Sequence, residues 1–358
     1  MSCVLFISAR PLDRAENIKA VWDAYDGEKE FMQTGTGREP DYRGEKYSLL
    51  VADELPNASP GKCIFIGHGM GAGKSYGLQQ PGGYFRHPEL ITYAIASSED
   101  MIPYVARFAG IPKEKVIPLG MPRTDAYFKA KKAETKQKHF LYAPTFRWWD
   151  WQPNWERLSR ALPEGSVIDV KAHMVTGWIM PRQYSNIQEY SARKPSTPFL
   201  VQADAVITDY SSIMFDAMVL RKPVVLFALD KDEYLEKRGM YCEYPERYSK
   251  YFCESEKALG KCMEQAEWDD YSEELRQFYA GACDGSSTAR TIDLIKSVLE
   301  DEVKMMKVIL PNGVIAESNN PVTVEQWKKA GYKEVVPAKP AEPPVEKAPE
   351  TKRKGKKK

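Results

Sequence analysis

The chain has 358 residues, of which 43% are hydrophobic and 28% charged, with a formal net charge of +1. No apolar run approaches the length of a membrane span, and the N-terminus lacks the basic and then apolar plan of a secretory signal, so the sequence indicates neither an integral membrane protein nor a secreted one. Six cysteines without a C-x-x-C pair and four histidines without zinc-ligand spacing predict a cytoplasmic protein with reduced thiols and no structural zinc.

Strand and helix signals alternate through the first part of the chain. An amphipathic helix is expected around residues 15–25, a loop at 33–46, and a second helix from Ser98 to about Ala109. Apolar runs predict strands at residues 4–7, 48–52, 63–66, 91–96 and 116–119. This alternation predicts a parallel sheet with helices on both faces, in an N-terminal domain of residues 1–128.

The same pattern resumes after a charged linker at residues 129–138. A Trp-rich helix is expected after Arg147, and a run of helices extends to about residue 303. Strands are predicted at residues 140–143, 167–170, 205–207 and 224–227. Residues 129–303 therefore predict a second α/β domain of similar size, with the site in the cleft between the two.

The C-terminal end of the chain has a different composition. Residues 304–337 predict a small appended unit with an Asn-Gly hairpin, one helix and a last strand. Residues 338–358 carry a net charge of +5 and almost no apolar side chains, so we expect a disordered basic tail. A partner for this tail would be an anionic polymer or the inner membrane surface.

A polar turn between a buried strand and an apolar helix is the first candidate site. Asp209, Ser211 and Ser212 lie where the N-terminus of a helix exposes unpaired N–H groups and its positive dipole end. The carboxyl end of a parallel strand is also where open α/β sheets bind ligands. The turn therefore predicts an anion site, and the alternative is that Asp209 or Ser211 only caps the helix.

Two histidines follow predicted strands in corresponding places. His68 opens the segment H-G-M-G-A-G-K-S, which approaches a phosphate-binding loop but has His68 where that motif needs glycine. Pro81 and the glycines after it also prevent the helix that such a loop requires. We instead interpret His68 as a general base at a strand end, repeated in the other domain by His173, although a histidine bonded within a turn is the plainer alternative.

Several blocks together resemble the CDP-glycerol glycerophosphotransferases, the family of teichoic acid polymerases and primases. They span about residues 60–300 in the family's order: H-G from His68 with Lys74, G-M-P-R-T-D from Gly120, Y-A-P-T-F-R from Tyr142, K-A-H from Lys171, I-T-D-Y-S-S to Ser212, D-E-Y to R-G at Gly239, and C-D-G-S-S from Cys283. The resemblance implies a GT-B-like fold, two Rossmann-like domains facing a cleft, with a last helix crossing back to the first domain.

The sequence departs from the family pattern at two places in the expected site. The family's H-G-T-P-x-K is H-G-M-G-A-G-K here, and the proline after the second histidine is Met174. The acceptor or the donor's alcohol can therefore differ. The chain opens on its first strand, so a long N-terminal extension with a membrane-docking region is not expected.

The resemblance implies transfer of a polyol phosphate, with glycerol phosphate preferred, from a CDP-activated donor to a polyol-phosphate or glycan acceptor, with release of CMP. His68 would be the general base, with His173 as the second catalytic residue. The donor diphosphate would be bound by Arg147, Lys171, Asp209, Ser211, Ser212, Asp284, Gly285 and Ser286, and the acceptor side would include Gly69, Lys74 and Arg123. The donor is a substrate, and neither a cofactor nor a metal is expected.

Two other functions remain open from the residues alone. A GT-B glycosyltransferase using a nucleotide sugar would need similar anion sites, and its product would carry a transferred sugar instead of a phosphate. A non-catalytic module that binds polyanionic polymer would use the fold and the basic tail, and would tolerate the loss of His68.

Overall fold

The computed structural model describes most of the chain and divides it into two compact units, Met1–Leu299 and Glu300–Lys358. The described residues are 3–34, 47–54, 62–67, 69–70, 88–147, 151–173, 178–190, 194–240, 242–300, 306–309, 315–318 and 331. No helix in these ranges is both long and apolar enough to cross a bilayer.

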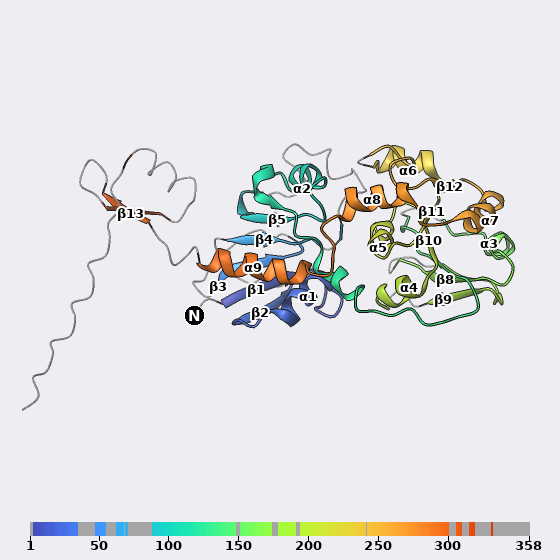
Figure 1. The fold of residues 1–358 in the computed structure, drawn as a ribbon, viewed down its shortest axis with the longest axis horizontal. Helices are drawn as coiled ribbons and strands as arrows, with labels where there is room; N and C mark the ends of the chain where they lie inside the picture. The colour runs from blue at the N-terminus through green and yellow to red at the C-terminus, as the bar shows by residue number, and fades with distance from the viewer. Residues whose placement is uncertain are drawn as a thin grey trace, which may run out of the picture. The chain divides into compact units, whose positions relative to one another are not determined.

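The first half of the chain forms a six-stranded parallel sheet (Figure 1). Its order is β2-β1-β3-β4-β5-β6, from β1 (Cys3–Ser8), β2 (Lys29–Gln33), β3 (Tyr47–Ala52), β4 (Cys63–Phe65), β5 (Tyr93–Ile95) and β6 (Val116–Ile117). Two α-helices connect its strands, α1 (Glu16–Ala24) and α2 (Ile102–Ala109), with short 3-10 turns at Pro88–Leu90, Lys113–Lys115 and Pro122–Ala126. Parallel strands need such crossovers, as the sequence pattern predicts.

The second half forms another six-stranded parallel sheet. Its order is β12-β11-β10-β7-β8-β9, from β7 (His139–Tyr142), β8 (Val167–Lys171), β9 (Ile187–Tyr190), β10 (Ala205–Thr208), β11 (Val224–Phe227) and β12 (Tyr251–Cys253). The helices are α3 (Trp155–Ala161), α4 (Thr197–Gln202), α5 (Ile213–Val219), α6 (Lys231–Lys237), α7 (Glu256–Gln265), α8 (Asp270–Ala280) and α9 (Ser287–Glu300). The predicted α/β architecture with two parallel sheets is confirmed.

Alternate strand residues pack on opposite faces of each sheet, because side chains in a strand point alternately up and down. In β1, Val4 and Phe6 join the largest core, whereas Leu5 and Ile7 join a separate cluster on the other face. The largest core also contains all of the described side chains of α5 apart from Asp216, which explains why that helix is apolar on every side.

The last helix of the compact unit, α9, packs beside the first sheet although it follows the second in sequence (Figure 1). Arg290 in α9 donates to the Leu119 carbonyl, and Lys62 donates to the Val298 carbonyl over 2.8 Å. Ile295 and Val298 are buried in the same core as Val4. The two halves are therefore joined by a shared core as well as by the chain.

Side-chain caps and close packing explain how several helices are placed. In α7, the Gly260 backbone lies so close to α3 that an added Cβ would be 2.5 Å from the Ala161 carbonyl oxygen. Helix N-termini are capped by side chains that accept from the first turn: Asn154 for α3, Ser255 for α7 and Asp269 for α8.

In the second unit, β13 (Met306–Ile309) pairs antiparallel with β14 (Ile315–Ser318). The Asn-Gly turn between these strands, the expected helix and last strand of the appended unit, and the basic tail lie outside the described residues.

Candidate active site

The carboxylate of Asp209, directly after β10, is buried and contacts protein groups through both oxygens. One oxygen accepts from the Thr145 N–H over 2.7 Å, and the other lies 2.8 Å from Nη1 of Arg147. Asp209 has no exposed surface and does not cap α5. The carboxylate thus holds the loop after β7 in place, and its predicted contact with a diphosphate stays a prediction.

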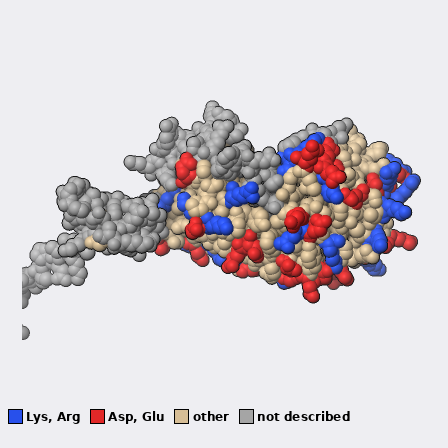
Figure 2. Space-filling model, turned by 90° about the horizontal axis from the view of Figure 1, so that it is seen from above, with Lys and Arg blue, Asp and Glu red and all other residues tan. Residues whose placement is uncertain are grey.

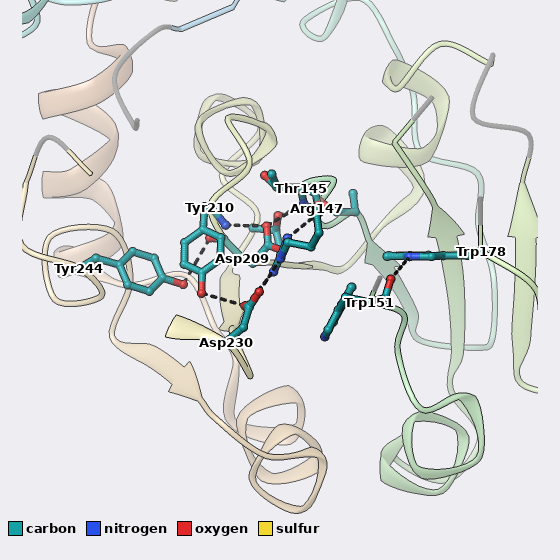
Figure 3. Close-up of polar contacts among 10 residues, drawn as sticks. Thr145, Arg147, Trp151, Trp178, Asp209, Tyr210, Asp230 and Tyr244 are labelled. Carbon is teal, nitrogen blue, oxygen red and sulfur yellow. Dashed lines mark hydrogen bonds and ion pairs between the residues drawn. The ribbon is translucent and has the colours of Figure 1, made fainter. Parts of the chain in front are cut away.

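The Arg147 guanidinium is the centre of a buried polar network (Figure 3). Its side chain is 2% exposed and forms two hydrogen bonds to Asp230, of 2.6 and 2.9 Å, in addition to its contact with Asp209. The Tyr210 hydroxyl donates to Asp230, and the Trp151 ring lies 4.8 Å from the guanidinium carbon. Arg147 is consequently a buried cation that pairs with two carboxylates, and its predicted contact with the phosphates stays a prediction.

The hydroxyls of Ser211 and Ser212 are the polar groups of this turn that the network leaves accessible. Ser211 is half-buried and Ser212 is exposed, at the start of α5. The turn after β4 approaches them from the first half, since a Cβ added to Gly69 would be 3.7 Å from the Ser212 hydroxyl oxygen. The predicted base His68 precedes Gly69 in this turn; His68 and Lys74 themselves lie outside the described residues.

Lys171 ends β8 at the same carboxyl edge of the second sheet. In the described part of the chain, no hydrogen bond or ion pair engages its ammonium group. Burial lowers the pKa of Lys171, and the Glu16 carboxylate at the start of α1 partly offsets this by raising it. A half-buried ammonium group facing a residue of the other half is available to neutralise an anion.

His173 is exposed, and its ring packs 4.7 Å from the ring of Phe146, between centroids. The guanidinium of Arg238 also packs on Phe146, 5.7 Å from the ring centroid. Arg238 is 7% exposed and belongs to the R-G pair after α6. The structure thus places His173 beside an aromatic ring and a cation that sequence reasoning did not assign to the site.

Arg123, predicted on the acceptor side, forms an ion pair between the two halves. Its Nη2 lies 2.9 Å from the carboxylate of Asp216 in α5, which also accepts from the Tyr127 hydroxyl over 2.9 Å. Burial raises the pKa of Asp216, and the charge of Arg123 opposes that rise. The guanidinium is 10% exposed and already paired, and its predicted place on the acceptor side stays a prediction.

The helix start at Asp284, Gly285 and Ser286, the predicted second diphosphate site, has protein partners in this structure. The carboxylate of Asp125, from the first half, accepts from the N–H groups of Ser287 and Thr288 over 3.0 and 2.7 Å, and so caps α9. Asp284, just before α9, pairs with Arg290 in that helix, and the Phe128 ring lies close to Gly285. The first-turn amides are consequently occupied by protein.

The motif blocks nevertheless contact one another in pairs, and the two blocks of each pair are distant in sequence. The block at 142–147 is tied to the block at 208–212 by Asp209, and the block at 120–125 is tied to the one at 283–287 by Asp125. Sequence reasoning assigned no role to Asp125, Asp216 or Asp230. Their side chains are buried, and burial cannot be read from a motif.

On the face drawn in Figure 2, acidic and basic side chains of the described residues are interspersed. Within the described ranges, no three His, Cys, Asp or Glu side chains are grouped to hold a metal ion. Among the described residues, Ser211 and Ser212 carry accessible hydroxyls at the facing turns, and Lys171 is a half-buried cation at the same edge of the second sheet.

Comparisons with known proteins find the same family that the motif blocks resemble. Residues 49–297 match the family model described as CDP-glycerol:poly(glycerophosphate) glycerophosphotransferase. A teichoic acid poly(ribitol-phosphate) polymerase of Bacillus spizizenii is 28% identical over 277 residues, which cover 69% of this chain and 45% of the relative. A teichoic acid glycerol-phosphate primase of Bacillus subtilis is 29% identical over 220 residues, covering 55% of this chain and 58% of the relative.

The chain spans about half the length of these curated relatives. Among solved structures, the wall teichoic acid polymerase TagF superposes with a TM-score of 0.66 at 18% identity, over 85% of this chain and 90% of that one. At this identity the likeness establishes a common fold of two Rossmann-like halves.

Proposed function

Because the chain belongs to the CDP-glycerol:poly(glycerophosphate) glycerophosphotransferase family, we propose that it transfers a polyol phosphate from a CDP-activated donor to an acceptor hydroxyl. The observation that carries the proposal is the approach of the two turns: Gly69, after β4, lies against Ser212, after β10. This contact brings the carboxyl ends of both sheets together, where α/β proteins bind their ligands.

The proposed reaction is a displacement at phosphorus. The acceptor hydroxyl oxygen forms a bond to the phosphorus that carries the polyol, and the bond from that phosphorus to the CMP oxygen breaks. CMP leaves with the electron pair, and the hydroxyl proton passes to His68. The protein has to position the hydroxyl and stabilise the charge of the diphosphate, because little other chemistry is required of it.

Three accessible groups have the chemistry to hold the diphosphate. The hydroxyls of Ser211 and Ser212 can donate to phosphate oxygens, and the ammonium group of Lys171 can neutralise part of the charge. Arg147 and Asp209 act indirectly, since they fix the loop from which the serines project. His173 stays our proposed second catalytic residue, with its ring position set by Phe146.

Glycerol phosphate is the polyol phosphate we propose first, with ribitol phosphate as the second candidate. The family description names glycerophosphate, whereas one relative reported above is a ribitol-phosphate polymerase. Transfer of a sugar from a nucleotide sugar has less support, because both curated relatives are named for a polyol phosphate.

The test is to incubate the full chain with CDP-glycerol or CDP-ribitol, with and without polyol-phosphate acceptors, and to measure CMP. We expect acceptor-dependent CMP release and a new phosphodiester detected by phosphorus NMR. His68→Ala should lower the rate by about 10²- to 10⁴-fold, as the loss of a general base does. Sugar transfer without phosphate transfer would support the glycosyltransferase instead, and donor binding unaffected by His68→Ala without any turnover would support a binding module.

Donor contacts can be tested separately by calorimetry. Ser211→Ala with Ser212→Ala should weaken CDP-glycerol binding by about 10- to 150-fold for each lost hydrogen bond to a charged oxygen. The affinity for CMP, which has one phosphate, should fall less. Ser255→Ala is the matched control, because Ser255 is an exposed serine that caps another helix, α7, and should leave donor affinity unchanged. A lowered melting point with unchanged CDP-glycerol affinity in the double variant would make the turn a helix cap only.

A further inference from the structure

The buried side chain of Asn17 connects two segments that are distant in sequence. Asn17 is the second residue of α1 and is 1% exposed. Its Nδ2 donates to the Gly67 carbonyl over 3.0 Å, and its Oδ1 accepts from the Arg123 N–H over 3.0 Å. One partner needs a donor and the other an acceptor, so a side-chain amide satisfies both, whereas a carboxylate of the same size satisfies only one.

Each end of this connection leads to one of the two facing turns. The Gly67 carbonyl belongs to the peptide bond that joins Gly67 to His68, the proposed base. At the other end, the side chain of Arg123 is paired with Asp216 over 2.9 Å. Asp216 lies in α5, the helix that begins directly after Ser211 and Ser212.

We propose that Asn17 is a positioning residue that holds Gly67, the residue before His68, at a fixed place relative to the turn carrying Ser211 and Ser212. The amide fixes the Gly67 peptide, and the Arg123–Asp216 ion pair transmits that position to α5. The inference rests on the proposed function for its turnover readout, but the positioning itself can be measured without turnover. All three residues are 10% exposed or less, so water does not offer their polar groups a substitute partner.

Asn17→Asp is the most selective perturbation. The carboxylate keeps an acceptor for the Arg123 N–H but places an oxygen against the Gly67 carbonyl oxygen, where the native amide donates. We expect kcat with CDP-glycerol to fall by about 10²-fold, because misplacing a reacting group by about 1 Å has that effect. The KM for CDP-glycerol should stay within about twofold, since Asn17 does not contact the serines.

Ser166→Ala is the matched control for lost buried hydrogen bonding. The Ser166 hydroxyl is in a 5% exposed residue, donates to the Pro163 carbonyl, and lies just before β8, at the sheet edge opposite the site. This variant should lose stability comparably to Asn17→Asp and keep kcat. Equal loss of kcat in both variants would overturn the proposal, because the effect would then be general destabilisation.

A second readout is the imidazole NMR signal of His68, which does not depend on catalysis. The chain has four histidines, so selectively labelled protein gives few signals, and His68→Gln identifies the one of interest. We expect the His68 signal to shift in Asn17→Asp and, through the ion pair, in Asp216→Asn. The His139 signal, from β7 in the other half, should not move.

The outcomes distinguish a failure of the proposed function from a failure of the positioning role of Asn17. If the wild-type chain releases no CMP from CDP-glycerol, the proposed function fails, and the His68 signal alone decides whether Asn17 positions the turn. An unchanged His68 signal in Asn17→Asp overturns the positioning role, and so does a shifted signal with unchanged kcat. If Asn17→Asp does not fold, Asp216→Asn carries the same test, and an unmoved His68 signal there overturns the link to α5.

Discussion

Replacing Gly120 by alanine should destabilise the contact between the two halves. Gly120 has φ +80°, and a Cβ built there would be 2.3 Å from the Ser287 hydroxyl oxygen and 2.4 Å from the Ala282 carbonyl oxygen. The left-handed backbone alone costs an alanine about 1–2 kcal/mol. The added Cβ would also push the Ala282 backbone and α9 away from Gly120, and this overpacking costs about 1–3 kcal/mol more. The expected loss of unfolding free energy is therefore about 2–5 kcal/mol.

Gly165→Ala provides a matched control for the cost of placing an alanine in the left-handed backbone conformation. Gly165 has φ +75°, almost the same as Gly120, but a Cβ there has nothing within 4 Å. Urea denaturation of both variants and the wild type gives the two free energies, and their difference isolates the steric contact with the segment before α9. If Gly120→Ala loses no more unfolding free energy than Gly165→Ala, the close approach of Gly120 to Ala282 does not destabilise the variant. That result would refute the reasoning.

Three further perturbations test other contacts by the same denaturation assay. Asp125→Asn should lower the unfolding free energy by about 1 kcal/mol, as the loss of a helix cap does, and an unchanged value would mean that α9 does not need this cap. Arg147→Met leaves two buried carboxylates without their cation and should cost about 3–5 kcal/mol; a loss below about 1 kcal/mol would contradict the network. Burial raises the pKa of the Asp53 carboxyl to about 6 from 3.8, so the native state holds this proton more tightly than the unfolded chain does. Between these two pH values the contribution of Asp53 to unfolding free energy falls as pH rises, by about 3 kcal/mol in all, and Asp53→Asn should lack that part of the pH dependence.

The sequence predicted the central strands better than the edge strands. Strands β1, β3, β4, β7, β10 and β11 appear as apolar runs because they are covered on both faces. The missed strands are β2, β9 and β12, and each lies at the edge of its sheet. At an edge the pattern is weaker: β2 reads K-E-F-M-Q and is half-buried throughout.

The sequence located the turns of the candidate site, but it did not show which of their side chains are buried. Motif blocks identified the turns after β4, β8 and β10, because polar residues directly after buried strands mark the carboxyl edge of a sheet. The blocks could not show which polar side chains are turned inward. Asp209 and Arg123 are motif residues that bind protein groups, whereas Asn17 and Asp216 hold the turns without standing out in the sequence.

The capping of α9 by Asp125 has a consequence for how the chain is made. The first sheet is synthesised early, yet the helix that covers it and buries Ile295 and Val298 follows about 160 residues later. Domains usually fold in order as they leave the ribosome, N-terminal first. Here the first half stays without its last helix until the second half has been translated. Assembly of the two halves is therefore the closing step of biosynthesis, and it places the turn after β4 against the turn after β10 only when the whole compact unit is present.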